Sequence, residues 1–167
     1  NKDYVLASDT DSLYVTMESM VEKVGLTDTD KIIKFLDTIC DGKIQDVIDK
    51  DYDEMAEYVN AFEQKMVMKR EVLAEVAIWT GKKHYILNVH NSEGVQYDEP
   101  KLKIMGIEAV KSSTPEPCRN ALKEALKIMM NGTEEDVINY IEAFKTKFKT
   151  LPTEEVSFPR SVKGLAK

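Results

Sequence analysis

The pattern of apolar and polar positions divides the chain into a part rich in predicted strands and a helical part. Two short β-prone runs, residues 4–7 and 13–16, flank a polar stretch, which predicts a hairpin with an acidic tip. From residue 30 to residue 62 apolar residues recur at helical spacing. This spacing predicts one long amphipathic helix, or two helices broken near Gly42, packed across the back of a sheet.

Three further extended segments follow the predicted long helix. Residues 66–79 and 84–89 read as strands joined by a turn that contains Gly81, and residues 101–110 read as a strand or an extended connection. The order strand, strand, helix, strand, strand favours an antiparallel sheet backed by helices. The predicted fold class is therefore α+β, with a helical segment after the sheet.

Beyond Lys111 the pattern predicts an α-hairpin. Its first helix starts near Thr114, with Ser113 and Glu116 spaced as a capping box, and Gly132 ends it. A second helix starts at Thr133, and the tail at residues 152–167 has no clear period. We therefore predict two domains, residues 1–110 and residues 111–167.

Composition and charge limit the classes of protein that fit. The 167 residues are 43% hydrophobic and 32% charged, which is typical of a globular protein. No apolar run approaches the roughly 18 residues of a membrane span, and the two cysteines without a secretory signal favour a reducing cytosol. Because the chain opens at Asn1, directly in a strand-like run, we expect it to be part of a longer protein.

The net charge of −7 taken alone argues against a nucleic-acid partner, but the charge is unevenly distributed. Residues 1–100 carry 11 basic and 21 acidic side chains, whereas residues 101–167 carry 12 basic and 9 acidic ones. The acidic residues 1–100 are able to hold metal ions, and the mildly basic residues 101–167 are able to bind a polyanion. Acidic side chains that simply decorate exposed helix faces are the alternative interpretation.

The acidic hairpin tip is the first candidate for chemistry. Asp9 and Asp11 lie two residues apart, so on a strand their carboxylates project from the same face. Two adjacent carboxylates resist joint ionisation unless a cation neutralises them, and oxygen ligands on a rigid turn suit Mg²⁺. The alternative is a structural turn, in which the aspartates bond their own backbone.

Three ordered motifs give the chain a family resemblance. Residues 4–15, with Asp-Thr-Asp-Ser at residues 9–12, resemble the motif C hairpin of family B DNA polymerases. Residues 79–85, Trp-Thr-Gly-Lys-Lys-His-Tyr, resemble the primer-side Lys-Lys-basic-Tyr turn of that family. Residues 103–115 resemble the palm-to-thumb junction of the replicative polymerases of T-even-like bacteriophages. The resemblance covers nearly the whole chain, as the second half of a palm at residues 1–110 and the base of a thumb at residues 111–167.

The resemblance implies an enzyme that adds deoxynucleotides to a primer 3′ end on a template. Asp11 then corresponds to the carboxylate that binds both Mg²⁺ ions, Asp9 is its neighbour and a second candidate ligand, and Glu71 matches a palm carboxylate near the metal site. Mn²⁺ is a possible substitute for Mg²⁺. A salt bridge between Glu71 and its basic neighbours Lys69 and Arg70 is the alternative for Glu71.

The resemblance also assigns a DNA-binding set and a cellular setting. The implied DNA contacts are Lys82, Lys83, His84, Tyr85, Lys111, Ser112 and Ser113. Lysines in a tight turn suit phosphates, which are present whatever the base sequence. The implied partners are primer–template DNA and deoxynucleoside triphosphates, with no membrane, and the implied setting is the cytoplasm of a bacterial host.

The chain departs from the family pattern at several points. Ser8 stands where glycine is common, and His84 stands where arginine is common. We find no motif A aspartate, no fingers helix, no exonuclease motif and no clamp-binding C-terminal tail, so we expect a fragment without polymerase activity of its own, whose parent enzyme binds a sliding clamp. Two other classes remain: a glycosyltransferase with an Asp-x-Asp metal site, and a non-enzymatic acidic metal-binding or interaction module.

Overall fold

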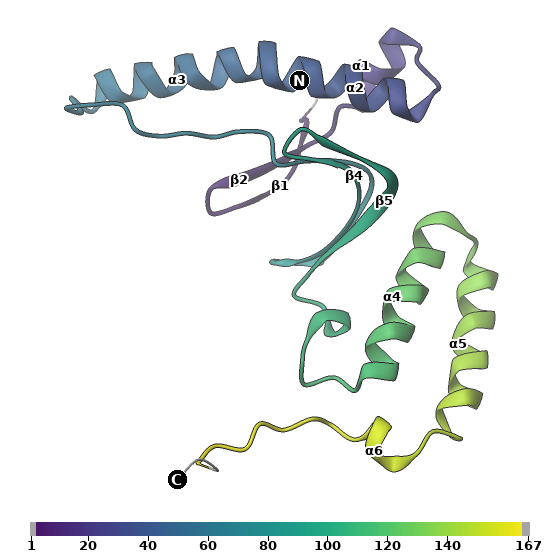
Figure 1. Ribbon diagram of the computed structural model, residues 1–167. Coiled ribbons are helices and arrows are strands. Elements are labelled where there is room, and N and C mark those ends of the chain that lie inside the picture. The colour runs from purple at the N-terminus through teal and green to yellow at the C-terminus, as the bar shows by residue number, and fades with distance from the viewer. Residues whose placement is uncertain (1–2, 165–167) are drawn as a thin grey trace. The chain divides into compact units, whose positions relative to one another are not determined.

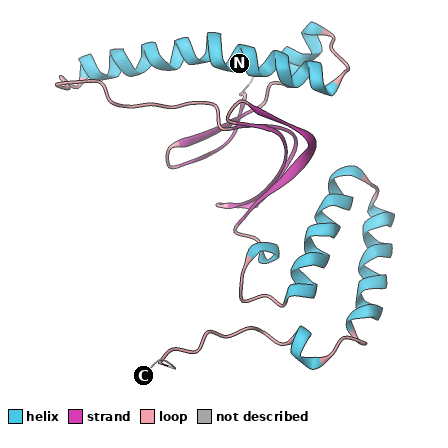
Figure 2. Ribbon diagram, viewed as in Figure 1, coloured by secondary structure: helices cyan, strands magenta, loops and turns pink. Residues whose placement is uncertain are grey.

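The computed structural model describes residues 3–164 of the chain. Within these residues the chain forms a two-stranded sheet, a three-stranded sheet and several helices (Figures 1 and 2). Both sheets are antiparallel, and the predicted α+β class is confirmed.

The N-terminal hairpin consists of β1 (Val5–Asp9) and β2 (Ser12–Val15). Asp9 pairs with Ser12, so the strands continue up to the acidic motif and leave a two-residue turn. A bulge interrupts the pairing between Val5 and Ala7. The predicted hairpin is confirmed, with a tighter tip than the sequence pattern suggested.

A helical run follows the hairpin. It comprises α1 (Glu18–Val24), α2 (Thr29–Ile39), a π-helical turn (Cys40–Ile44) and α3 (Gln45–Tyr58). The carboxylate of Asp28 caps α2 by accepting a hydrogen bond from the Lys31 amide at 2.9 Å. The π-helical turn contains Gly42, so the helix continues through the position where a break was one of the two predictions.

The small apolar core of this part joins α2 to the three-stranded sheet. Ile33 and Leu36 of α2 contact Leu73, and all three are buried. By contrast, α3 buries none of its residues in the described chain, and its Val47 is 58% exposed. The prediction that the whole segment packs across a sheet is therefore wrong for α3, because the described residues bury none of its side chains fully and cover Ile48, Tyr52 and Ala56 only in part.

The second sheet has the order β3 (Val72–Gly81), β4 (His84–Ser92), β5 (Val95–Met105). The central strand β4 is buried from Tyr85 onward, which is expected of a strand with a neighbour on each side. The strand β3 begins at Val72, later than the predicted residue 66, and β5 begins at Val95, earlier than the predicted residue 101. Residues 66–71 form no strand, and α3 holds this segment instead, because the Gln45 side chain donates to the carbonyl of Met68 at 2.9 Å.

A short 3₁₀ helix (Glu108–Val110) leads to the helical hairpin of α4 (Glu116–Asn131) and α5 (Glu134–Phe148). The predicted end of α4 at Gly132 is confirmed, and the rings of Phe144 and Phe148 lie 5.7 Å apart on α5.

The two helices of this hairpin begin differently. Thr133 and Asp136 form a reciprocal capping box at the start of α5. The capping box predicted for α4, with Ser113 and Glu116, is wrong, because Pro115 occupies the N-cap position and no side chain caps the helix. The tail contains one helical turn, α6 (Thr153–Val156), and residues 165–167 of the predicted tail lie outside the described residues.

The contacts within the chain define two compact units. The first unit comprises Asn1–Glu75 with Val89–Lys101, and the second comprises Val76–Asn88 with Leu102–Lys167. The tip of the β3–β4 hairpin therefore groups with the helical hairpin, and each unit is described by itself below. The domain boundary between residues 110 and 111 stays a prediction about the parent enzyme.

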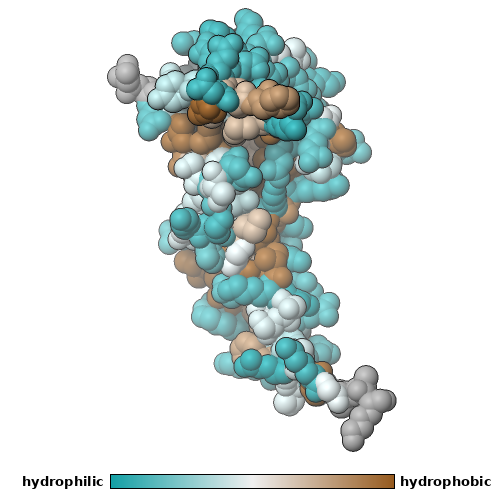
Figure 3. All heavy atoms as spheres, turned by 90° about the vertical axis from the view of Figure 1, so that its left-hand side faces the viewer, coloured by the Kyte–Doolittle hydropathy of each residue, from teal (hydrophilic) through white to brown (hydrophobic). Residues whose placement is uncertain are grey.

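Apolar side chains also remain at the surface, as the brown patches in Figure 3 show. The hairpin contributes Tyr4, Val5, Leu6, Leu13 and Val15, each at least 45% exposed. No helix in residues 3–164 has both the length and the apolar character that crossing a membrane requires.

Candidate metal and nucleic-acid sites

The acidic tip is a two-residue turn, Thr10-Asp11, between paired strands. Thr10 has a φ of 54°, a left-handed conformation that is uncommon for a threonine. Two side chains hold the turn at Asp9: Ser12 donates to the Asp9 carbonyl at 3.0 Å, and Thr10 donates to the Asp9 carboxylate at 3.3 Å. The tip is thus fixed by its own short polar side chains.

The two aspartates of the tip differ in their surroundings. Asp9 is the half-buried last residue of β1, whereas Asp11 is exposed in the turn. The expectation that both project from one strand face does not apply, because Asp11 lies beyond the strand. Among residues 3–164 no hydrogen bond or ion pair engages the Asp11 carboxylate, and its oxygens are accessible to a ligand.

The donor set of the tip fits part of a magnesium site. Mg²⁺ is usually held by one or two carboxylates, several waters and substrate phosphates. In the described part of the chain no three acidic, histidine or cysteine side chains gather closely enough to hold a metal ion. The tip therefore offers up to two carboxylates, which is the number that a Mg²⁺ ion usually takes from a protein.

Glu71 lies just before β3, in a segment that is held from several sides. The backbone amide of Glu93 donates to the Glu71 carbonyl at 2.8 Å. The same segment lines an open groove of about 680 Å³ together with Asp41, Gln45, Lys69, Arg70, Glu93 and Gly94. The exposed Glu71 side chain belongs to the first unit, as do Asp9 and Asp11.

The Arg70 side chain connects this segment to two other elements. Its guanidinium bonds the Asp37 carboxylate on α2 and donates to the side-chain oxygen of Asn91 at 2.9 Å. The Arg70 side chain is 9% exposed, and Asn91 is 1% exposed. Arg70 thus ties the segment before β3 to α2 and to β4. The sequence pointed only to a local pairing of Arg70 with Glu71, because nothing in the spacing links residues 37, 70 and 91.

The lysine turn in the second unit is another two-residue turn, Lys82-Lys83, between β3 and β4. Both lysines are exposed, and Lys83 has a φ of 60°. The ring Nδ1–H of His84 donates to the Lys82 carbonyl at 2.8 Å, and Thr80 donates to the His84 carbonyl at 3.4 Å. The turn therefore presents two cations from a backbone that its neighbours hold in place.

Tyr85 lies one residue further into β4 and is 6% exposed. Its ring packs against Trp79 on β3, with the ring centroids 6.3 Å apart. This packing anchors the strands directly behind the lysine turn. It also limits the surface that Tyr85 offers to DNA, and its DNA contact stays a prediction.

Lys111 follows the 3₁₀ helix and pairs with Glu108 at 2.6 Å. The hydrogen bond from Lys111 is the main reason that the pKa of Glu108 lies below its usual value, and the charge of His84 lowers it slightly further. The lysine turn and the Lys111 segment, which are separate motifs in the sequence, both belong to the second unit. Ser112 and Ser113 are exposed in the loop between Lys111 and α4.

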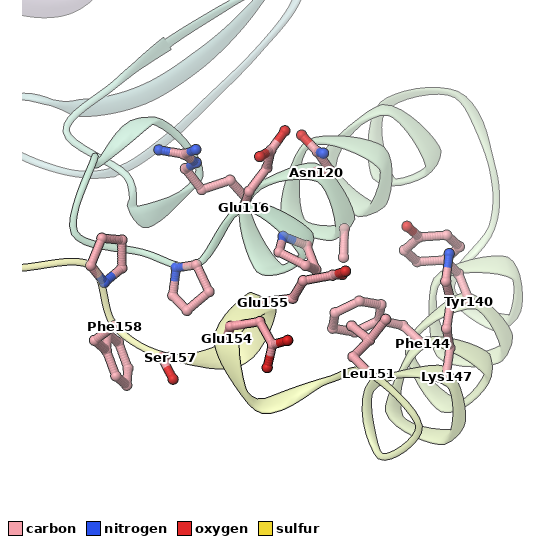
Figure 4. Close-up of a pocket in the computed structure, with 15 residues that line it drawn as sticks. Glu116, Asn120, Tyr140, Phe144, Lys147, Leu151, Glu154, Glu155, Ser157 and Phe158 are labelled. Atoms are coloured by element: carbon pink, nitrogen blue, oxygen red, sulfur yellow. The ribbon is translucent and has the colours of Figure 1, made fainter.

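A larger groove of about 850 Å³ lies among α4, α5 and α6 (Figure 4). Tyr140 and Phe144 of α5 line it opposite Glu116 of α4. Burial raises the pKa of the Tyr140 hydroxyl, and the charge of Glu124 raises it further. None of the predicted site residues lines this groove.

The first unit thus presents an exposed carboxylate at its hairpin tip, and the second unit presents two exposed lysines at a sheet turn. The chain belongs to the family B DNA polymerases: residues 1–146 match the model of the family described as divergent family B DNA polymerase.

Two curated relatives are similar over nearly the whole chain. The DNA-directed DNA polymerase of Escherichia phage RB69 is 39% identical over 175 residues, which cover 98% of this chain and 19% of the relative. The DNA-directed DNA polymerase of Enterobacteria phage T4 is 32% identical over 178 residues, which cover 100% of this chain and 20% of the relative. The chain therefore spans about a fifth of the length of these relatives.

The family match decides between the alternatives that the Asp-x-Asp motif left open. A glycosyltransferase and a non-enzymatic acidic module both share that motif, but neither accounts for a match that extends over 146 residues. The resemblance to the polymerases of T-even-like phages is confirmed.

Proposed function

We propose that this chain forms part of the polymerising centre of a phage DNA polymerase. The proposed parent enzyme adds deoxynucleotides to a primer 3′ end on a template and releases pyrophosphate. The observation that carries the proposal is the family match over residues 1–146, which includes the acidic tip, the lysine turn and the Lys111 segment. The proposed partners are primer–template DNA and deoxynucleoside triphosphates. The proposed setting is a bacterial host cell, since both relatives come from bacteriophages.

In this proposal Asp11 is the main metal ligand and Asp9 is its neighbour. Two Mg²⁺ ions, or Mn²⁺ in their place, supply activation of the primer hydroxyl and neutralisation of the triphosphate when the complete site is assembled. Asp11 is suited to this role because its carboxylate is exposed on a turn that Ser12 and Thr10 hold in place. Glu71 contributes a further negative charge from the segment that Arg70 fixes.

Lys82, Lys83 and Lys111 are the proposed contacts to the primer backbone, and His84, Tyr85, Ser112 and Ser113 support them. Phosphate contacts carry no sequence information, as a replicating enzyme requires. A sliding clamp as a partner of the parent enzyme also stays a prediction.

Binding of primer–template DNA as a function of salt concentration tests the DNA-contacting role. Each lysine that neutralises a phosphate contributes about 0.9 to the slope of log affinity against log salt. We expect Lys82→Ala with Lys83→Ala to lower that slope by about 2 and to weaken binding at every sequence alike. The matched control is Lys43→Ala with Lys50→Ala, which removes two exposed lysines from the acidic helices and leaves the slope unchanged. An unchanged slope in the Lys82/Lys83 variant contradicts the assignment.

Primer extension tests the second part of the proposal. With two carboxylates at the tip and no larger ligand cluster in the described residues, we expect this chain by itself not to elongate a primer. Robust elongation by the purified chain contradicts this expectation.

A further inference from the structure

One glycine of the second unit lies against the lysine turn. Gly106 follows β5 directly and has a φ of 72°, in the left-handed region. A Cβ atom built on Gly106 would lie 2.3 Å from the backbone carbonyl oxygen of Lys83 and 2.9 Å from Cδ2 of the His84 ring. Both distances are shorter than non-bonded carbon contacts allow, and the Lys83 oxygen belongs to the backbone. Any side chain at position 106 must therefore displace the lysine turn.

The other glycines near the sheet have no such neighbour. A Cβ on Gly81, in the same hairpin, meets no atom within 4 Å. A Cβ on Gly94, in the β4–β5 turn, also meets none, although Gly94 shares a positive φ of 85°. Gly106 is thus distinguished by the close approach of the turn as well as by its backbone conformation.

The turn that Gly106 contacts needs external support. Lys83 has a φ of 60°, and a non-glycine residue keeps such a conformation only where its surroundings determine it. The hydrogen bond from His84 to the Lys82 carbonyl supplies one constraint, and the backbone of Gly106 beneath Lys83 and His84 supplies a second. Because Glu108 and Lys111 follow within five residues, the same contact links the lysine turn to the segment that presents Lys111.

We propose that Gly106 is a positioning residue that fixes the Lys82-Lys83 turn against the Lys111 segment, so that the three lysines present one surface to the DNA backbone. This inference rests on the proposed DNA-contacting role of these lysines. Gly106 itself contacts no DNA, and its function is to leave room for the turn. Alanine at this position therefore acts on DNA binding through Lys82 and Lys83.

The test combines amide NMR spectra with salt-dependent binding of primer–template DNA. We expect Gly106→Ala to shift the amide signals of Lys82, Lys83 and His84 and to lower the salt slope by about 2, as Lys82→Ala with Lys83→Ala does. Adding Gly106→Ala to that lysine double variant should cost less than it costs in the wild-type chain, because the contacts of Lys82 and Lys83 are already gone. Gly81→Ala controls for an added methyl in the same hairpin, and Gly94→Ala controls for strain at positive φ. Both control variants should show the wild-type amide signals of Lys82, Lys83 and His84 and the wild-type salt slope.

Two results overturn the inference: Gly106→Ala with wild-type turn signals and slope, or a loss in the lysine double variant as large as the loss in the wild-type chain. If the wild-type chain does not bind DNA, the proposed function fails, and the amide signals still decide whether Gly106 holds the turn. If Gly106→Ala does not fold, NMR spectra of the wild-type chain test the contact instead. They should show a nuclear Overhauser effect between the Gly106 α protons and the His84 ring Hδ2, and absence of that signal refutes the contact.

Discussion

Replacing Arg70 by alanine tests how the segment that carries Glu71 is held. The change removes the bonds from the guanidinium to Asp37 and to Asn91, in a side chain that is 9% exposed. Asn91 keeps one partner, because its side-chain oxygen also accepts from the Gly94 amide at 3.1 Å. Asp37 loses its cation while its own side chain is only 27% exposed.

The size of the effect follows from these exposures. Removing one member of a fully buried ion pair costs about 3–5 kcal/mol, and exposed pairs are worth about 0–1 kcal/mol. Because water reaches part of Asp37, we expect Arg70→Ala to lower the free energy of unfolding by about 2–3 kcal/mol. A double-mutant cycle with Asp37→Ala should give a coupling free energy of about 1–3 kcal/mol.

Urea unfolding followed by far-UV circular dichroism measures the change. The expected result is a lower midpoint with an unchanged dependence on urea concentration. Lys50→Ala is the control, because the Lys50–Glu54 pair at 3.3 Å is 74% and 63% exposed and should contribute less than about 0.5 kcal/mol. An Arg70→Ala variant as stable as Lys50→Ala refutes the role assigned to Arg70.

Three further predictions concern the core, a helix cap and a thiol. Leu36→Ala should lower the free energy of unfolding, measured in urea, by about 2–4 kcal/mol, because Leu36 is buried in the core. Val47→Ala, on the exposed face of α3, should lower it by less than about 0.5 kcal/mol. Equal losses in the two variants would contradict the described core. Thr133→Ala removes the N-cap of α5 and should cost about 1 kcal/mol, with a loss of helical signal on heating; Thr133→Ser should retain the cap. Burial raises the pKa of the Cys40 thiol, so at pH 8–9 Cys40 holds less thiolate in the folded chain than in the unfolded chain. Iodoacetamide reacts with the thiolate, and it should therefore alkylate Cys40 more slowly in the folded chain than in the chain unfolded by urea. Equal alkylation rates would contradict the burial of Cys40.

The sequence predicted those elements that local patterns determine. The acidic hairpin followed from β-prone runs around short polar residues, and the start of α5 followed from Thr133, whose partner Asp136 is only three residues away. Gly132 and the Lys82-Lys83 turn were equally local signals. In each case the residues that determine the structure are close to it in the chain.

Features that depend on distant residues were not predictable in this way. The start of β3 at Val72 depends on contacts of the preceding segment with Gln45, Asp37 and Asn91, none of which is visible in periodicity. The α4 capping box failed because Pro115 took the cap position from Ser113. Among the glycines, nothing in the sequence distinguishes Gly106 from Gly81, because the distinction arises from the return of β5 beside the β3–β4 turn.

The exposed surface of α3 and of the hairpin is a related case. Apolar residues at helical spacing in residues 45–58 predicted packing, but the described chain buries none of them fully and covers Ile48, Tyr52 and Ala56 only in part. A periodic pattern shows which face of a helix avoids water, and it does not identify the partner.

Paramagnetic Mn²⁺ titration tests the central claim, that Asp11 at the hairpin tip is a divalent-metal ligand. We expect Mn²⁺ to broaden the amide signals of residues 9–12 first, and Asp11→Asn to abolish this selective broadening while the hairpin stays folded. Asp98→Asn removes the same charge from an exposed position on β5 and should leave the broadening unchanged. Selective broadening that persists in Asp11→Asn, or no broadening at the tip of the wild type, contradicts the claim.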